Sequence, residues 1–231
     1  MAEEKEKDRG FLRGVLLFRD LPDGELAKVA QLLVEKKVGK HHVIFEEGEQ
    51  GNAFYLIKSG LVKISKAASD GRAKTLAILK QGEFFGEMSM LSEEKRTASA
   101  EALLETRLYV LDKPNFSALI NKNPLLSLQI IRTLIERLAQ ADRQIKNLAL
   151  GNSRAKVADI LLFLAEQFGN RDKLPTKVNI KLTHQEIADL AGLARETTTK
   201  LLNEFVRDGA IQLADKEIEI VDVAKLREWV M

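Results

Sequence analysis

The chain has no cysteine, and this absence excludes several classes of protein at once. Disulfide bonds, thiolate zinc sites, cysteine-ligated iron–sulfur clusters and cysteine nucleophiles all require thiols. Three histidines in 231 residues also argue against haem or a multi-histidine metal centre. We therefore expect a functional site without metal, and the lack of cysteine fits a reducing cytoplasm.

A strong charge of one sign and long hydrophobic runs are missing too. The 36 Lys and Arg nearly balance the 34 Asp and Glu, so the net charge of +2 predicts neither a charged disordered tail nor bulk binding of polyanions. The longest apolar runs, such as residues 160–165, are too short to span a bilayer, and the charged N-terminus is unlike a signal peptide. We expect a cytoplasmic protein with no membrane partner.

Residues from about 36 to 111 alternate short β-branched and aromatic segments with glycine-centred turns. Phe54-Tyr55-Leu56-Ile57 is one such segment, and Asp70-Gly71 is a strong hairpin signal. Many short strands at even spacing predict a compact antiparallel barrel or jelly roll.

A helical pattern begins after Pro124 and continues to about Leu150. Its apolar residues recur at steps of three and four, as in a heptad seam. Such a helix either packs on its own domain or pairs with a second copy, and the polar flanks of the narrow seam favour the dimer. The predicted seam consists of Ile131, Leu134, Leu138, Ala141, Ile145 and Leu148.

The segment after the break at Gly151-Asn152 has the spacing of a helix-turn-helix. Thr183 and Glu186 stand at the two positions of a capping box, and Gly192 suits the tight turn before a second helix. The alternation after Asp208-Gly209 predicts a β wing. The second helix is predicted to expose Arg195, Glu196, Thr198, Thr199 and Lys200 near its start, where such helices meet base edges.

Charge alone does not identify this small domain as a DNA binder. Residues 151–231 hold 12 Lys and Arg against 13 Asp and Glu, a net charge of −1. DNA-binding domains are usually basic, and any helical hairpin can show the same spacing. Affinity for DNA would need clustered cations and the doubled contacts of a dimer.

The stretch from Gly82 to Leu91, followed by Arg96-Thr97, places glycines, acids, an arginine and hydroxyls within sixteen residues. Packing alone explains such a segment poorly. A small phosphorylated ligand held between a short helix and a strand explains it well, because a buried phosphodiester needs one fixed cation and several aligned donors. The alternative is a structural ion pair of Arg96 with Glu87, Glu93 or Glu94.

These segments together resemble the Crp/Fnr family of bacterial transcription regulators, over about residues 12–222. The resemblance implies an α+β fold with a cyclic-nucleotide-binding β-roll (jelly roll) in residues 1–122, a dimerisation helix in 123–150 and a winged helix-turn-helix DNA-binding domain in 151–231. The matching segments are Glu47-Gly48-Glu49, Phe54–Ile57, Gly60, Gly82–Glu87, Arg96–Ala98, Thr183–Ala188 and Arg195–Thr197.

The resemblance also implies a cyclic nucleotide as effector and assigns its site. Two positions that face the base in this family have changed: Ala141 cannot form a hydrogen bond through its side chain, and Asp142 accepts when ionised. Cyclic AMP remains the expected effector, and cyclic GMP is the alternative. A further alternative is that Asp142 pairs with a basic neighbour such as Lys146 and leaves the base to other contacts. The expected ligand-binding residues are Gly86, Glu87, Met88, Ser89, Arg96, Thr97, Ala141 and Asp142.

For the DNA-binding domain, the resemblance implies a homodimer on a palindromic promoter site with TGTGA-like half-sites. Arg195 and Glu196 match the base-reading residues, whereas Lys200 stands where the family has a second arginine. We expect RNA polymerase as a further partner and no enzymatic activity, since no catalytic pair accompanies Arg96. A regulator competent for DNA without ligand, or one responding to cyclic di-GMP, is the alternative. The expected DNA-binding residues are Arg195, Glu196, Thr198, Thr199, Lys200, Thr183 and Gln185.

Overall fold

A computed structural model describes residues 9–67, 73–150, 152–168, 176–178, 182–214 and 217–230. The chain separates into two compact units, Met1–Leu138 and Ala139–Met231, and each is described by itself. The expected long helix is α5 (Pro124–Leu150), which continues from the first unit into the second. The predicted boundaries at residues 122 and 150 stay predictions, and Asp70-Gly71 and Gly151 lie outside the described residues.

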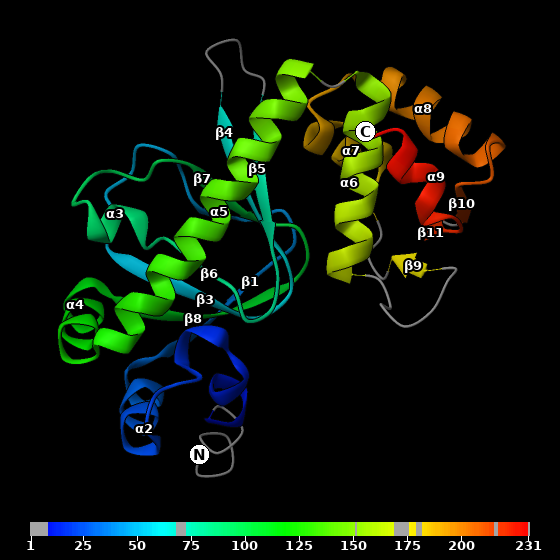
Figure 1. Cartoon of the computed structure of the whole chain (residues 1–231). Helices are drawn as coiled ribbons and strands as arrows, with labels where there is room; N and C mark the ends of the chain where they lie inside the picture. Colours follow the sequence, from blue (N-terminus) through cyan, green and yellow to red (C-terminus); the bar gives the residue numbers. More distant parts are fainter. Residues whose placement is uncertain are drawn as a thin grey trace. The chain divides into compact units, whose positions relative to one another are not determined.

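Two four-stranded antiparallel sheets form the first unit (Figure 1). The strand orders are β1-β8-β3-β6 and β2-β7-β4-β5, and the facing sides of the two sheets share one apolar core. The predicted jelly roll is confirmed. The strands are β1 (Val34–Val38), β2 (Val43–Phe45), β3 (Ala53–Ser59), β4 (Val62–Ala67), β5 (Ala73–Leu79), β6 (Phe84–Phe85), β7 (Ser99–Ala102) and β8 (Thr106–Asp112).

Strand β3 is buried on both of its faces, which explains its unbroken apolar run. Tyr55 and Ile57 belong to the core between the sheets. Phe54 and Leu56 belong to a second core, which the helices of this unit cover. Those helices are η1 (Leu16–Phe18), α2 (Asp23–Leu32), α3 (Met88–Leu91), α4 (Lys113–Lys122) and the start of α5.

The start of α5 has one buried and one exposed apolar side. Leu126 and Ile130 are buried in the second core, and Leu134 packs against it. Leu134, which the predicted seam includes, is thus partly buried against its own domain. The exposed apolar stripe, defined here by residues that are each about half exposed or more, consists of Leu125, Leu128, Ile131, Ile135 and Leu138.

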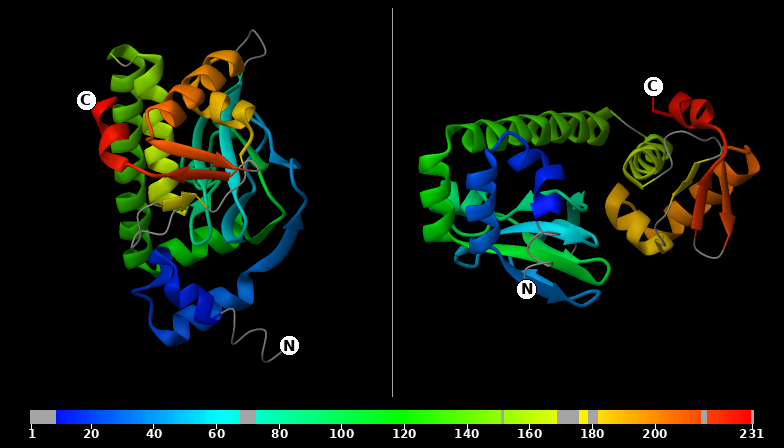
Figure 2. Two further views of the ribbon diagram at one scale, coloured as in Figure 1. Left: turned by 90° about the vertical axis from the view of Figure 1, so that its right-hand side faces the viewer. Right: turned by 90° about the horizontal axis from the view of Figure 1, so that it is seen from below.

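Helix α6 (Ser153–Phe168) lies at the centre of the second unit and packs against α7, α8 and α9 (Figure 2, right). Val157, Leu161 and Leu164 are fully buried in this packing. The predicted wing is present as two antiparallel strands, β10 and β11, and β9 pairs with β11. The remaining elements are β9 (Thr176–Val178), α7 (His184–Ala191), α8 (Arg195–Arg207), β10 (Ile211–Ala214), β11 (Glu217–Ile220) and α9 (Val223–Glu228).

Helices α7 and α8 form the helix-turn-helix through the predicted local signals. The Thr183 hydroxyl accepts a hydrogen bond from the Glu186 backbone N–H, and the Glu186 carboxylate accepts one from the Thr183 N–H. Gly192 ends α7 in the left-handed conformation, with φ at 66°, which a residue without a side chain adopts at little cost. The first exposed turn of α8 begins three residues later.

Candidate functional site

The candidate ligand site begins where strand β6 turns into the short helix α3. Gly86 stands at this turn with φ at +83°, in the left-handed region that favours glycine. A side chain at Gly86 would also collide with Arg96, since a Cβ placed there would lie 2.8 Å from Arg96 Nη1. The glycine therefore allows both the turn and the close approach of the arginine.

Arg96 is a buried cation, with 5% of its surface exposed. Its Nη1 donates to the Gly86 carbonyl oxygen and to the Ser89 hydroxyl, each at 2.8 Å, and its Nη2 donates to the Ala53 carbonyl oxygen at 2.7 Å. The guanidinium also lies 4.2 Å from the centre of the Phe45 ring. Burial lowers the pKa of Arg96, which means that its charge is only partly compensated.

No carboxylate pairs directly with Arg96 among the described residues. Glu87, Glu93 and Glu94 all belong to the described part of the chain, and none forms an ion pair with it. The alternative of a structural ion pair is therefore wrong. Arg96 Nε is buried and has no hydrogen-bond partner there, so the site keeps a fixed cation with an unused donor.

Glu87 is the second buried charge of the site, with 1% exposure. Its Oε1 accepts a hydrogen bond from Arg137 Nη1 at 2.9 Å, whereas its Oε2 is buried without a partner among the described residues. Burial raises the pKa of Glu87, and the neighbouring Arg137 guanidinium opposes this shift. The free carboxylate oxygen is available to a donor such as a ligand hydroxyl.

Arg137 is a site residue that the sequence analysis missed. It reaches the site from α5, donates to the Phe84 carbonyl oxygen and lies 5.0 Å from the centre of the Phe84 ring. The signal was present in the sequence, because Arg137 follows Ile130 and Leu134 at helical spacing on the core-facing side of α5. A cation at such a position needs a buried partner.

The other predicted ligand residues in the first unit divide into buried and exposed ones. Ser89 is buried against Arg96, and the close approach of Gly51 leaves no room there for another side chain. Met88 and Thr97 are exposed, and the Thr97 hydroxyl lies 3.9 Å from the Met88 sulfur. The structure thus brings together Gly86, Glu87, Met88, Ser89, Arg96 and Thr97.

The two residues predicted to face the base lie on α5 in the second unit. Ala141 and Asp142 are both exposed there. Asp142 follows Ile135 by seven residues and Leu138 by four. It therefore occupies the next position on the side of α5 that carries the exposed apolar stripe, although its own side chain is charged. The side chains of Ile145 and Leu148, which completed the predicted seam, lie outside the described part of the structure.

Helix α8 presents the candidate DNA interface. Arg195, Glu196 and Lys200 are exposed, and Thr199 is half-buried with its hydroxyl 3.0 Å from His184 Nδ1. Gln185 donates to the Asp189 carboxylate at 2.7 Å. Thr183 caps α7, so its hydroxyl is engaged within the domain.

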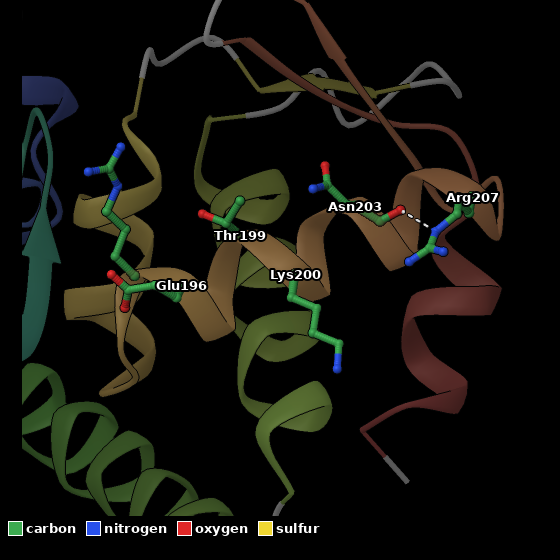
Figure 3. Close-up of a pocket in the computed structure, with 6 residues that line it drawn as sticks. Glu196, Thr199, Lys200, Asn203 and Arg207 are labelled. Atoms are coloured by element: carbon green, nitrogen blue, oxygen red, sulfur yellow. Dashed lines mark hydrogen bonds between the residues drawn. The ribbon is translucent and has the colours of Figure 1, made fainter.

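Thr198 is fully buried, so the prediction that it is exposed toward DNA is wrong. It lies on the side of α8 that also buries Leu201, Leu202 and Phe205. The exposed side instead includes Asn203 and Arg207, which the sequence analysis missed (Figure 3). Helical spacing from Lys200 could have found both, because residues three, four and seven apart share one face.

Metal clusters and membrane-spanning helices are both absent from the described residues. Within the described ranges, no three His, Asp or Glu side chains gather in a way that could hold a metal ion. None of the helices described is long and apolar enough to be a candidate membrane span.

Comparison with known proteins matches a part of each unit to a known domain family. Residues 35–123 match the cyclic nucleotide-binding domain, and residues 155–229 match the Crp-like helix-turn-helix domain. Together these two ranges cover the candidate ligand site around Arg96 and the candidate DNA interface on α8.

Curated relatives are similar over nearly the whole chain. The CRP-like cAMP-activated global transcriptional regulator of Mycobacterium tuberculosis is 34% identical over 91% of this chain and 94% of its own length. The cyclic AMP receptor protein of Thermus thermophilus is 33% identical over 94% and 97%.

A solved structure gives the same relationship. The crystal structure of a CRP/FNR-family transcriptional regulator from Thermus thermophilus covers 85% of this chain and 98% of that one, with 29% identity and a TM-score of 0.70. The chain therefore belongs to the Crp/Fnr family, as a DNA-binding transcription regulator that carries a cyclic nucleotide-binding domain.

Proposed function

We propose that the protein is a homodimeric transcription regulator whose binding to a palindromic, TGTGA-like promoter site is switched by a cyclic nucleotide. The observation that carries the proposal is the pair of unpartnered buried atoms, Arg96 Nε and Glu87 Oε2, beside the left-handed turn at Gly86. Buried polar atoms in native proteins are nearly always paired, so an unpaired donor and acceptor in one site point to a ligand that supplies both partners.

A ribose cyclic phosphate has the complementary groups. Its anionic phosphate suits the Arg96 guanidinium and the backbone N–H groups that follow Gly86. Its ribose 2′-hydroxyl suits the free Glu87 oxygen. Cyclic AMP is the expected effector, and the two curated relatives described above are named for cyclic AMP.

The base is the less constrained part of the ligand. Ala141 offers no side-chain hydrogen bond, and Asp142 can accept from the adenine amino group or from the two adjacent donors of guanine. Cyclic GMP is therefore the rival effector. Calorimetric titration with cyclic AMP, cyclic GMP and cyclic di-GMP ranks the three, and no measurable binding of any of them would contradict the ligand proposal.

Dimerisation is proposed through residues 123–150. The exposed apolar stripe on α5 is a continuous helix face of leucine and isoleucine, which a second copy of the same helix covers well. Leu138, with 63% of its surface exposed, stands in its last part. Asp142 in the same line would place a polar residue within the seam, which typically fixes the register of two helices at some cost in stability.

The switch is a two-state population shift. The ligand binds the DNA-competent arrangement more tightly, and this brings two α8 helices to half-sites about 34 Å apart, one turn of DNA. A regulator that binds DNA without ligand is the alternative within the same class. No enzymatic turnover of the nucleotide is proposed, and the curated relatives are transcription regulators. A cytoplasmic location and contact with RNA polymerase complete the proposal.

Retardation of a TGTGA-type palindrome, titrated with each nucleotide, tests the whole proposal. We expect a retarded complex whose affinity rises with one nucleotide, and a scrambled duplex of equal length is the control. Equal retardation with and without every nucleotide would establish the constitutive alternative. Failure to retard the palindrome under all conditions would contradict the proposed half-site.

A further inference from the structure

The outer face of α8 extends well beyond the residues predicted to read bases. Steps of four, three and four residues place Glu196, Lys200, Asn203 and Arg207 on one side of the helix, and Figure 3 shows these side chains following one another. One groove runs along this face and is lined by Arg195, Glu196, Thr199, Lys200, Asn203 and Arg207.

Arg207, at the far end of this face, forms no ion pair with a carboxylate among the described residues. It is exposed, and among the described residues its side chain makes one long hydrogen bond, from Nε to the Asn203 carbonyl oxygen at 3.4 Å. Its guanidinium therefore keeps free donors that point along the helix surface.

The nearest acid on α8 is neutralised from the other side. Glu204 accepts hydrogen bonds from Arg154 Nε at 2.8 Å and Arg154 Nη2 at 2.6 Å, and 16% of its side chain is exposed. Arg154 also lies 4.6 Å from the centre of the Trp229 ring. The outer face of α8 thus presents three cations, Arg195, Lys200 and Arg207, against the single acid Glu196.

If α8 enters the major groove with its first turn, as recognition helices do, its length would put Arg207 outside the reach of the bases. Arg207 lies eleven residues after Glu196, which corresponds to roughly 17 Å along a helix. The major groove is about 12 Å wide. When the first turn of α8 contacts base edges, its last turn therefore reaches the wall of the groove, where phosphates lie. Arginine binds a phosphate with two parallel hydrogen bonds.

We propose that Arg207 binds a DNA phosphate at the edge of the major groove and anchors α8 there, independently of sequence. This inference rests on the proposed DNA binding through α8. It explains how a domain with a net charge of −1 gains affinity for a polyanion. Arg195 and Glu196 would select the half-site, whereas Arg207 would hold the helix on any DNA.

The test compares the full chain with its Arg207→Gln variant on the TGTGA-type palindrome and on a scrambled duplex, between about 50 and 200 mM salt. We expect the variant to lose affinity by the same factor on both duplexes. The slope of log K against log salt should become shallower by about 0.9 for each lost phosphate contact, one in each subunit. Arg207→Lys, which keeps the charge, should retain most of the slope.

Lys36→Gln is the matched control, since it removes one exposed cation from β1 in the first unit and should leave the slope unchanged. Thermal unfolding by circular dichroism checks that each variant is folded. An unchanged slope in Arg207→Gln would overturn the anchor and leave the proposed function intact. A loss confined to the palindrome would also overturn it, by showing base recognition. Absence of DNA binding by the wild type would instead contradict the proposed function itself.

Discussion

Two arginines, one in each unit, differ in burial in the way that their two proposed anionic partners differ in size. Arg96 is 5% exposed and is held by two carbonyl oxygens and a hydroxyl. Arg207 is exposed and makes one long hydrogen bond within the described residues. Burying a cation costs desolvation, so Arg96 suits one small anion in a fixed geometry. An exposed cation costs little and suits a polymer of phosphates, at the expense of sensitivity to salt.

Arg96→Gln should have the largest effect, because it removes the fixed charge of the ligand site. Loss of one partner of a buried, hydrogen-bonded charge pair costs about 2–5 kcal/mol, so the affinity for cyclic AMP should fall by roughly 30-fold or more. Calorimetric titration measures this change. Because the pair is buried, the affinity of the wild type for the nucleotide should depend only weakly on salt, unlike its affinity for DNA.

Arg107→Gln is the control for this prediction, since Arg107 is an exposed arginine on β8 whose side chain is 45% exposed beside Glu35. It should leave the nucleotide affinity within about twofold, as expected for an exposed ion pair that contributes little. If Arg96→Gln bound cyclic AMP as well as the control does, the two arginines would not differ as proposed.

Arg195→Ala should have the next largest effect, and on selectivity more than on affinity. A bidentate arginine contact to guanine contributes about 1–3 kcal/mol of discrimination against the wrong base. We therefore expect preference for the TGTGA-type half-site over single-base variants to fall by roughly 5- to 150-fold. Retardation of a panel of half-site variants measures it, and unchanged discrimination would show that Arg195 does not read a base.

The distance in sequence between interacting residues decides what the sequence can predict. The jelly roll and the helix-turn-helix follow from local signals, such as the alternation of strands with glycine turns and the capping box at Thr183 and Glu186. Gly86, Glu87 and Arg96 lie close together in sequence, so their meeting was predictable. Arg137 comes from a helix fifty residues after Glu87, and only the packing of α5 against the sheet brings it to the site.

Two helix residues show where helical spacing stops being informative. Spacing alone puts Leu134 in the seam and Thr198 on the exposed side, whereas Leu134 packs partly against its own core and Thr198 is fully buried. A step of three or four residues predicts which side chains share a face, but the direction of that face depends on what packs against the helix. Neighbouring positions, Ile135 and Thr199, are accordingly the more exposed ones.

Glu87→Gln should produce a smaller effect that depends on pH. Burial raises the pKa of Glu87 above its ordinary value of 4.5, so the folded protein holds this proton more tightly than the unfolded chain does. The resulting stability is fully present below about pH 4.5 and is lost as the pH rises through the raised pKa. A tenfold tighter hold on the proton corresponds to about 1.4 kcal/mol of stability.

Thermal unfolding of both proteins between about pH 4 and pH 7 measures this dependence, because glutamine at position 87 keeps the size of the side chain and cannot ionise. Relative to the variant, the wild type should lose stability as the pH increases. A wild type that gained stability over this range would show that Arg137 outweighs burial, and that Glu87 has a lowered pKa in the folded protein.

The smallest effect should come from Thr198→Val, which tests where the DNA-binding face of α8 ends. The Thr198 hydroxyl is buried without a hydrogen-bond partner among the described residues, and valine has nearly the same shape and helix propensity. Replacing an unsatisfied buried hydroxyl with a methyl group is neutral or slightly stabilising, so the unfolding temperature should stay equal or rise. DNA affinity should not change.

Thr199→Val is the matched control one residue further along the helix. Its hydroxyl lies 3.0 Å from His184 Nδ1, so this variant loses a contact between α7 and α8 on the half-exposed side. The lost hydrogen bond should cost about 1 kcal/mol of stability. Because Thr199 lines the groove on the outer face of α8, we also expect DNA binding to weaken by a few-fold. If Thr198→Val weakened DNA binding more than Thr199→Val did, the buried side of α8 would contribute to recognition, and the division of the helix into a packing face and a DNA face would be wrong.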